Sequence, residues 1–113
     1  MNLADKKCKA CEDKNMKPFS SAEAADYAVQ VPGWEVGEGG KKISRKFVFN
    51  NFVQAVDFIS GPIADIAEEE GHHPDVHLTG YKNVLIELST HSIGGLSEND
   101  FIVAAKINRL PIF

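Results

Sequence analysis

The hydrophobic residues of this chain follow helical spacing in some segments and extended spacing in others, and these changes mark the predicted elements. A first helix is predicted from Ser20 to about Gln30, because Ser20 and Glu23 have the spacing of a capping box. The segment 34–49 alternates apolar with polar residues on both sides of Gly39-Gly40, which predicts a β-hairpin. The first predicted elements are therefore a helix and two strands.

A longer helix is predicted next, capped by Asn50 or Asn51 and ended at Gly71. Pro62 lies inside this helix, where it removes a backbone hydrogen bond. We expect a kink at Pro62 rather than a break, because the apolar residues on its two sides stay in phase. These residues, which we expect to form the buried stripe of the helix, are Phe52, Val56, Ile59, Ile63 and Ile66.

Alternation returns in the segments 75–79 and 84–89, which predict two more strands separated by Gly80. A last helix is predicted after Ser97, because Ser97 and Asp100 repeat the capping-box spacing. The order helix, two strands, helix, two strands, helix predicts an α+β fold, in which helices cover one face of an antiparallel sheet.

The chain has 113 residues, which suffices for one domain with a hydrophobic core. A net charge of -4 and the absence of any run of Lys or Arg argue against a nucleic-acid-binding protein. No apolar stretch approaches the ~20 residues of a membrane span, and no secretory signal is recognisable, so we expect a cytoplasmic protein. Residues 1–18 are polar and rich in lysine. We expect them to form a loose arm before a single domain over residues 19–113.

Both cysteines, Cys8 and Cys11, lie in this arm as one C-x-x-C motif. A four-thiolate zinc site needs a second pair, and a redox motif needs a strand before it and a helix after it. We therefore expect no catalytic role for the cysteines. A zinc half-site completed by another subunit, an adventitious disulfide and no role at all remain the alternatives.

The four histidines of the chain are confined to one region: His72, His73, His77 and His91. Histidine is the side chain whose ordinary pKa lies nearest neutrality, so it suits proton transfer. Gly71 predicts a helix end and Pro74 favours extended backbone before it, which places the adjacent pair at a helix-to-strand junction. Neighbouring side chains diverge, so one metal ion is poorly placed to bind both imidazoles. These residues predict general acid–base chemistry without a metal, and a metal-binding module is the weaker alternative.

Two carboxylates accompany the histidines. Glu68 lies one helical turn before His72, and we expect the two side chains to contact each other. Asp100 follows Ser97 at capping-box spacing, so a cap of the last helix explains it without any substrate.

The motifs around these residues resemble those of one family. E-x-x-x-H-H-P runs from Glu68 to Pro74, an aromatic residue follows at Tyr81, S-T-H ends at His91, and G-L-S-E-N-D ends at Asp100. Over residues 18–110 the chain resembles the pterin-4a-carbinolamine dehydratases. Two departures stand out. The gap between Pro74 and Tyr81 is one residue longer than in animal members, and Gly71 replaces an acidic residue that some members have before the paired histidines.

The resemblance implies dehydration of 4a-hydroxytetrahydropterin (pterin-4a-carbinolamine) to quinonoid dihydropterin, a step of tetrahydropterin recycling, without a metal or cofactor. It implies that His72 and His91 act as acid or base and that His73 mainly binds the pterin. Glu68 would orient an imidazole or the pterin, and Tyr81 and Asp100 would join Glu68 and His73 in binding substrate.

The resemblance also implies a four-stranded antiparallel sheet with three helices on one face. The implied partners are a second copy or more, as a homodimer or homotetramer, and an aromatic amino-acid hydroxylase that supplies the substrate. A different class of function is a non-catalytic scaffold of the same fold, either a dimerisation cofactor or an assembly factor. The intact His72, His73 and His91 favour the enzyme, because a scaffold does not need three imidazoles.

Overall fold

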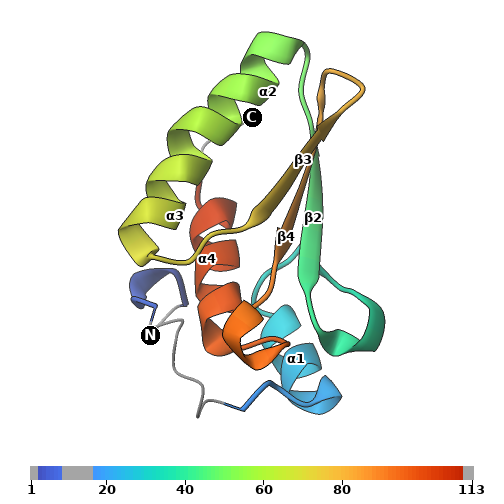
Figure 1. Ribbon diagram of the computed structural model, residues 1–113, viewed down its shortest axis with the longest axis vertical. Coiled ribbons are helices and arrows are strands. Elements are labelled where there is room, and N and C mark those ends of the chain that lie inside the picture. The colour runs from blue at the N-terminus through green and yellow to red at the C-terminus, as the bar shows by residue number, and fades with distance from the viewer. Residues whose placement is uncertain (1–2, 9–16, 111–113) are drawn as a thin grey trace.

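The fold is built on one antiparallel sheet, seen in a computed structural model that describes residues 3–8 and 17–110 (Figure 1). The strand order is β1-β2-β4-β3, and each neighbouring pair is antiparallel. The strands are β1 (Glu35–Val36), β2 (Ile43–Val48), β3 (Asp75–Thr79) and β4 (Asn83–Leu88). The edges of the sheet are therefore the very short β1 and the longer β3.

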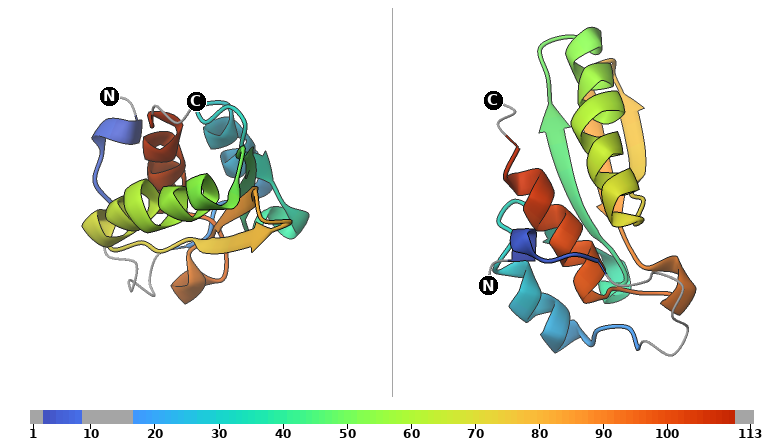
Figure 2. Two further views of the ribbon diagram at one scale, coloured as in Figure 1. Left: turned by 90° about the horizontal axis from the view of Figure 1, so that it is seen from above. Right: turned by 90° about the vertical axis from the view of Figure 1, so that its left-hand side faces the viewer.

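Helices cover one face of this sheet (Figure 2). The α-helices are α1 (Ser21–Ala28), α2 (Phe52–Phe58), α3 (Ala64–Glu70) and α4 (Glu98–Asn108). A π-helical turn, η3 (Ile59–Ile63), joins α2 to α3, so these elements form one long helix. Short 3₁₀ turns occur at η1 (Leu3–Asp5), η2 (Glu38–Gly40) and η4 (His91–Ile93). Counting the long helix once, three helices pack on a four-stranded sheet, which confirms the predicted α+β fold.

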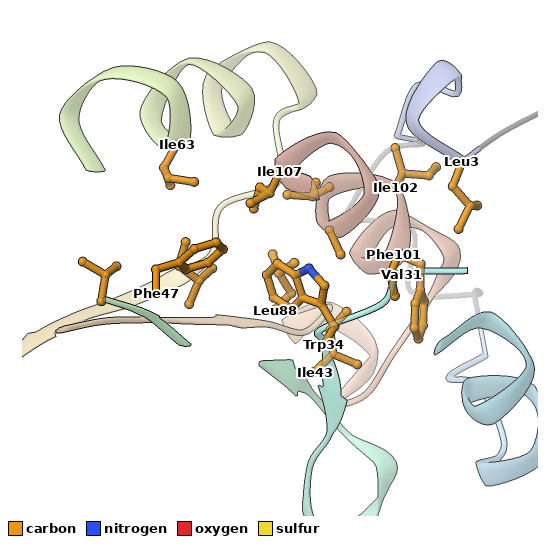
Figure 3. Close-up of a cluster of buried hydrophobic side chains, with 14 of the residues drawn as sticks. Leu3, Val31, Trp34, Ile43, Phe47, Ile63, Leu88, Phe101, Ile102 and Ile107 are labelled. Atoms are coloured by element: carbon orange, nitrogen blue, oxygen red, sulfur yellow. The ribbon is translucent and has the colours of Figure 1, made fainter. Parts of the chain in front are cut away.

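The two faces of the sheet differ because side chains alternate along each strand. Alternate residues of the two central strands form the buried face, namely Ile43, Phe47, Val84, Ile86 and Leu88, whereas Arg45 between the first two is only partly buried. These side chains belong to one core cluster with apolar residues of the helices, among them Ile63 and Ile107 (Figure 3). The opposite face carries polar side chains such as Lys46 and His77. The core therefore lies between the sheet and the helices.

The long helix passes through Pro62 without a break, as predicted, but its buried stripe differs from the prediction. Phe52 and Val56, expected in the core, are 53% and 38% exposed, whereas Ala55 and Phe58 are buried. The π turn explains the shift, because it holds one more residue per turn than an α-helix. The buried positions of α2 therefore lie one residue earlier in the sequence than expected. The expectation is an uninterrupted α-helical repeat that includes the buried Ile63.

The N-terminal segment also differs from the prediction of a loose arm over residues 1–18. Residues 3–8 of this arm pack against α4, with Leu3 only 5% exposed. The side chain of Lys6 bonds Glu98 at 3.0 Å and that of Arg109 bonds Asp5 at 2.8 Å. An apolar anchor and two ion pairs thus hold this part in place. Cys11 lies outside the described residues, so the C-x-x-C motif stays untested.

None of the helices in the described part of the chain combines the length and the apolar character that a membrane span requires.

Gly71 ends α3 as the sequence predicts. Its φ of 63° lies in the left-handed region, and its N–H donates to the carbonyl of Ala67. The N–H of His72 reaches the same carbonyl at 3.2 Å. A left-handed residue at this position turns the chain out of the helix, and glycine adopts this conformation at the lowest cost.

We predict that Gly71→Ala lowers the free energy of unfolding by about 1 kcal/mol, because a side chain disfavours the left-handed region. A Cβ at Gly71 would meet no atom within 4 Å, so the cost is conformational rather than steric. Gly61→Ala is the matched control, since Gly61 lies inside the long helix and a Cβ there also meets no atom within 4 Å. Urea unfolding should show no loss for the control. Equal losses in both variants would contradict this account.

Candidate active site

The buried centre of the candidate site is a pair formed by His72 and Asp100. His72 follows the helix end at Gly71 and is 4% exposed, and its Nε2 lies 2.6 Å from Oδ1 of Asp100. Because a carboxylate can only accept hydrogen bonds, the imidazole donates from Nε2. Nδ1 is then the acceptor atom whenever the ring is neutral. Asp100 therefore fixes both the direction of the ring and its tautomer.

The other oxygen of Asp100 is also occupied. Oδ2 accepts from the hydroxyl of Thr90 at 2.9 Å and from the backbone N–H of Ser97 at 3.0 Å. The bond to Ser97 is part of the predicted capping box of α4. Asp100 is 0% exposed, and a buried carboxylate of this kind needs several donors to offset its lost hydration. It thus joins the cap of α4 to the imidazole of His72, and its expected contact with substrate stays a prediction.

His73 is paired as well, but at the surface. Its Nε2 lies 2.5 Å from Oε2 of Glu68, and the two side chains are 63% and 77% exposed. The sequence placed Glu68 beside His72, and this expectation was wrong. The chain leaves the helix through the left-handed Gly71, which turns His72 inward and leaves His73 on the side of Glu68. A contact this exposed contributes little to stability, and it leaves the imidazole accessible.

His91 lies next to a residue of the same network. It opens η4 and is exposed, and the preceding Thr90 donates to Asp100. Backbone hydrogen bonds between Thr90 and Gly95 close the loop around it. One oxygen of Asp100 therefore bonds His72, and the other oxygen bonds Thr90, which directly precedes His91.

The structure does not place His77 and Tyr81 with these groups. His77 lies on the open face of the sheet, where Nε2 is 2.8 Å from Oε1 of Glu87. The hydrogen bonds that Glu87 accepts, first from Lys42 and then from His77, hold the pKa of that carboxyl below its ordinary value. Tyr81 is 58% exposed in the turn between β3 and β4. The five residues of β3 separate it from His73, a length of roughly 16 Å.

Sequence reasoning missed Thr90, Ser97 and Glu70 as members of this region. Thr90 and Ser97 are buried, and their hydroxyl oxygens lie 2.7 Å apart. Their only signal was position, since one precedes His91 and the other was already predicted as a cap. Glu70 is one of three consecutive glutamates, and nothing in such a run shows which one is buried.

The arrangement offers two oriented imidazoles, one buried and one accessible, at the junction of α3 and β3. In residues 3–8 and 17–110, no three His, Cys, Asp or Glu side chains gather as a set of metal ligands. The chemistry that these groups support directly is the donation and removal of protons.

Comparisons with known proteins agree on one family. A family model described as pterin 4 alpha carbinolamine dehydratase matches residues 17–110. Pterin-4-alpha-carbinolamine dehydratase 2, mitochondrial, of Arabidopsis thaliana is 45% identical over 113 residues, which cover 98% of this chain and 60% of that protein. A putative pterin-4-alpha-carbinolamine dehydratase of Halorhodospira halophila is 41% identical over 110 residues, covering 97% of this chain and 98% of the relative.

A solved structure has the same fold. It is the crystal structure of a transcriptional coactivator/pterin dehydratase from Brucella melitensis, with a TM-score of 0.73 and 32% sequence identity. The match covers 81% of this chain and 96% of that one.

We predict that Asp100→Asn lowers the free energy of unfolding by about 1–3 kcal/mol, because an amide group cannot accept on both sides and leaves a buried donor unpaired. Glu98→Gln is the matched control in the same turn of α4, where the side chain of Glu98 is 28% exposed. Its loss should stay below about 1 kcal/mol. Urea unfolding at neutral pH measures both variants. Indistinguishable curves for the two would contradict the importance of the buried carboxylate.

Proposed function

The chain belongs to the pterin-4a-carbinolamine dehydratase family, and we propose that it is a hydro-lyase that converts 4a-hydroxytetrahydropterin to quinonoid dihydropterin. One observation supports this most directly. An imidazole oriented by a buried carboxylate, His72 on Asp100, is followed in the chain by an exposed imidazole oriented by Glu68. Such a site has groups to move protons and a group to meet a ligand at the surface.

The reaction needs only proton transfers. Hydroxide leaves C4a as water when an acid protonates the leaving oxygen, and a base removes the proton from N5 as the new double bond forms. General acid–base catalysis of this kind contributes typically about 10²–10⁴-fold per group. His72 and His91 are the groups proposed for these two roles, and each fits either one.

The exposures of His73 and His72 suggest how the roles divide between them. His73 is 63% exposed, so it can meet the pterin over much of its ring, which fits a binding role. His72 is 4% exposed and offers a ligand far less of its surface. Such a group suits exchange of a proton at a fixed point better than broad contact. Glu68 and Asp100 then act through the imidazoles that they orient, His73 and His72.

We also propose a homodimer or homotetramer. A sheet with open edges at β1 and β3 can pair with another copy across a two-fold axis. The exposed Phe52 and Val53 on α2, 53% and 65% exposed, offer a second apolar surface. Light scattering at micromolar concentration tests this, and a monomer there would refute it.

The source of the substrate follows from its chemistry. A 4a-hydroxytetrahydropterin forms when a pterin-dependent hydroxylase reacts, so we propose that an aromatic amino-acid hydroxylase supplies it. The cytoplasmic location stays a prediction, and the Arabidopsis relative is mitochondrial by name.

A second candidate function is a non-catalytic scaffold. The Brucella protein is named as a transcriptional coactivator as well as a pterin dehydratase. The exposed apolar residues of α2 would suit a protein partner. Loss of the histidines would leave such a role intact, which separates it from the enzyme.

We predict that His73→Ala and His91→Ala each lower the turnover of chemically generated carbinolamine at least about tenfold, because each removes a group that binds substrate or transfers a proton. His72→Ala should lower it as much. Circular dichroism must accompany His72→Ala, since that side chain is buried.

His77→Ala is the control for these variants, because His77 lies on the open face of the sheet and bonds Glu87 instead. Its turnover should match that of the unaltered protein. An equal loss in His77→Ala, or full turnover in the variants of His73 and His91, would refute the proposed site.

A further inference from the structure

Glu70 is a buried carboxylate that the proposed chemistry does not use. Its side chain is 2% exposed at the end of α3, two residues before His72. Oε1 accepts the backbone N–H of Cys8 at 2.8 Å, and Oε2 accepts the ammonium group of Lys106 at 2.8 Å. Glu70 therefore joins three parts of the chain: the N-terminal segment, the end of α3, and α4.

These bonds keep Glu70 ionised. Burial alone raises the pKa of its carboxyl, but the hydrogen bonds from Lys106 and from the N–H of Cys8 outweigh burial and hold the pKa below its ordinary value. A buried carboxylate is costly unless donors surround it. The N–H of Cys8 is one of these donors, so the N-terminal segment helps to offset the free-energy cost of burying the Glu70 carboxylate.

The same segment also bonds the first turn of α4. The ammonium group of Lys6 lies 3.0 Å from Oε2 of Glu98, and the thiol of Cys8 lies 3.6 Å from the backbone carbonyl of Asn99. Asn99 directly precedes Asp100. The segment thus contacts the residue before Asp100 and, through Glu70, the helix end that leads to His72. Figures 1 and 2 show its 3₁₀ turn beside α4.

We propose that residues 3–8 form a strap which, through Glu70, positions the His72–Asp100 pair. The two members of this pair come from different helix ends, and their 2.6 Å hydrogen bond requires a fixed separation between the end of α3 and the start of α4. The strap bonds both of these ends. Glu70 is accordingly a positioning residue, and the effect of the strap on turnover rests on the proposed dehydratase function.

The test removes the N–H of Cys8 and leaves Glu70 in place. Cys8→Pro has no N–H to donate. Cys8→Ala is the matched control, because it keeps the N–H and removes only the thiol. For Cys8→Pro we expect kcat to fall about ten- to hundredfold, with KM within about twofold, since misplacement of a proton-transfer group acts on the chemical step. Cys8→Ala should lose clearly less kcat than Cys8→Pro, because it gives up only the weak thiol contact to the carbonyl of Asn99 and keeps the N–H bond to Glu70. An equal loss in Cys8→Ala would overturn the role of the N–H.

A second pair of variants approaches the same bond from Glu70. Glu70→Leu removes both acceptor oxygens, whereas Glu70→Gln keeps one oxygen for the N–H of Cys8. Glu70→Leu should reproduce the loss of Cys8→Pro, and Glu70→Gln should recover at least about half of kcat. If both changes act through one bond, the double variant should lose no more than the single ones. If the kcat loss of the double variant equalled the product of the two single losses, the two changes would act independently, and the proposal that they act through one bond would be overturned.

A spectroscopic measurement makes the test independent of turnover. The proton on Nε2 of His72 lies in a short hydrogen bond to Asp100 and should give a downfield NMR signal. This signal should shift or broaden in Cys8→Pro and Glu70→Leu, and it should change less in Cys8→Ala, which keeps the N–H bond to Glu70. If the unaltered protein lacked dehydratase activity, the proposed function would fail while this signal still tested the strap.

If Cys8→Pro and Glu70→Leu lowered only the midpoint of unfolding, while kcat and the His72 signal stayed unaltered in the folded protein, residues 3–8 would have a structural role alone. That result would overturn the proposal.

Discussion

The buried carboxylate of Asp100 is the constraint on which the candidate site depends. It is 0% exposed and accepts hydrogen bonds from His72, Thr90 and Ser97. A carboxylate so enclosed is stable only while its donors stay in place, so the start of α4, the loop before it and the end of α3 must all be held together. Fold and site are therefore linked at one residue. The same carboxylate caps a helix and orients an imidazole.

Local signals in the sequence were sufficient for most of the fold. Alternation and capping residues identify the strands and the helix starts, because they depend on neighbours within four residues. The π turn at Ile59–Ile63 was beyond such signals. A single extra residue in one turn shifts the buried face of α2 by one position, and periodicity alone cannot show on which side of Pro62 the shift falls.

The sequence singled out several of the side chains that pair around the junction of α3 and β3, but not their partners. Glu68 and Asp100 were both recognised, yet the sequence paired Glu68 with His72 and treated Asp100 as a cap. The actual partner of His72 is 28 residues away, and such contacts follow from packing rather than from spacing. Glu70 shows the same limit, because only its docked neighbours Cys8 and Lys106 distinguish it from the adjacent glutamates.

The two adjacent histidines end in opposite environments for a simple geometric reason. Beyond the left-handed Gly71 the backbone extends toward β3, and successive side chains of an extended chain point to opposite sides. One imidazole is consequently enclosed at 4% exposure and the other stands at 63%. The enclosed His72 bonds the buried Asp100, and the exposed His73 bonds the exposed Glu68. A glycine at the end of one helix thus gives the two residues of a dipeptide distinct environments, one enclosed and one accessible.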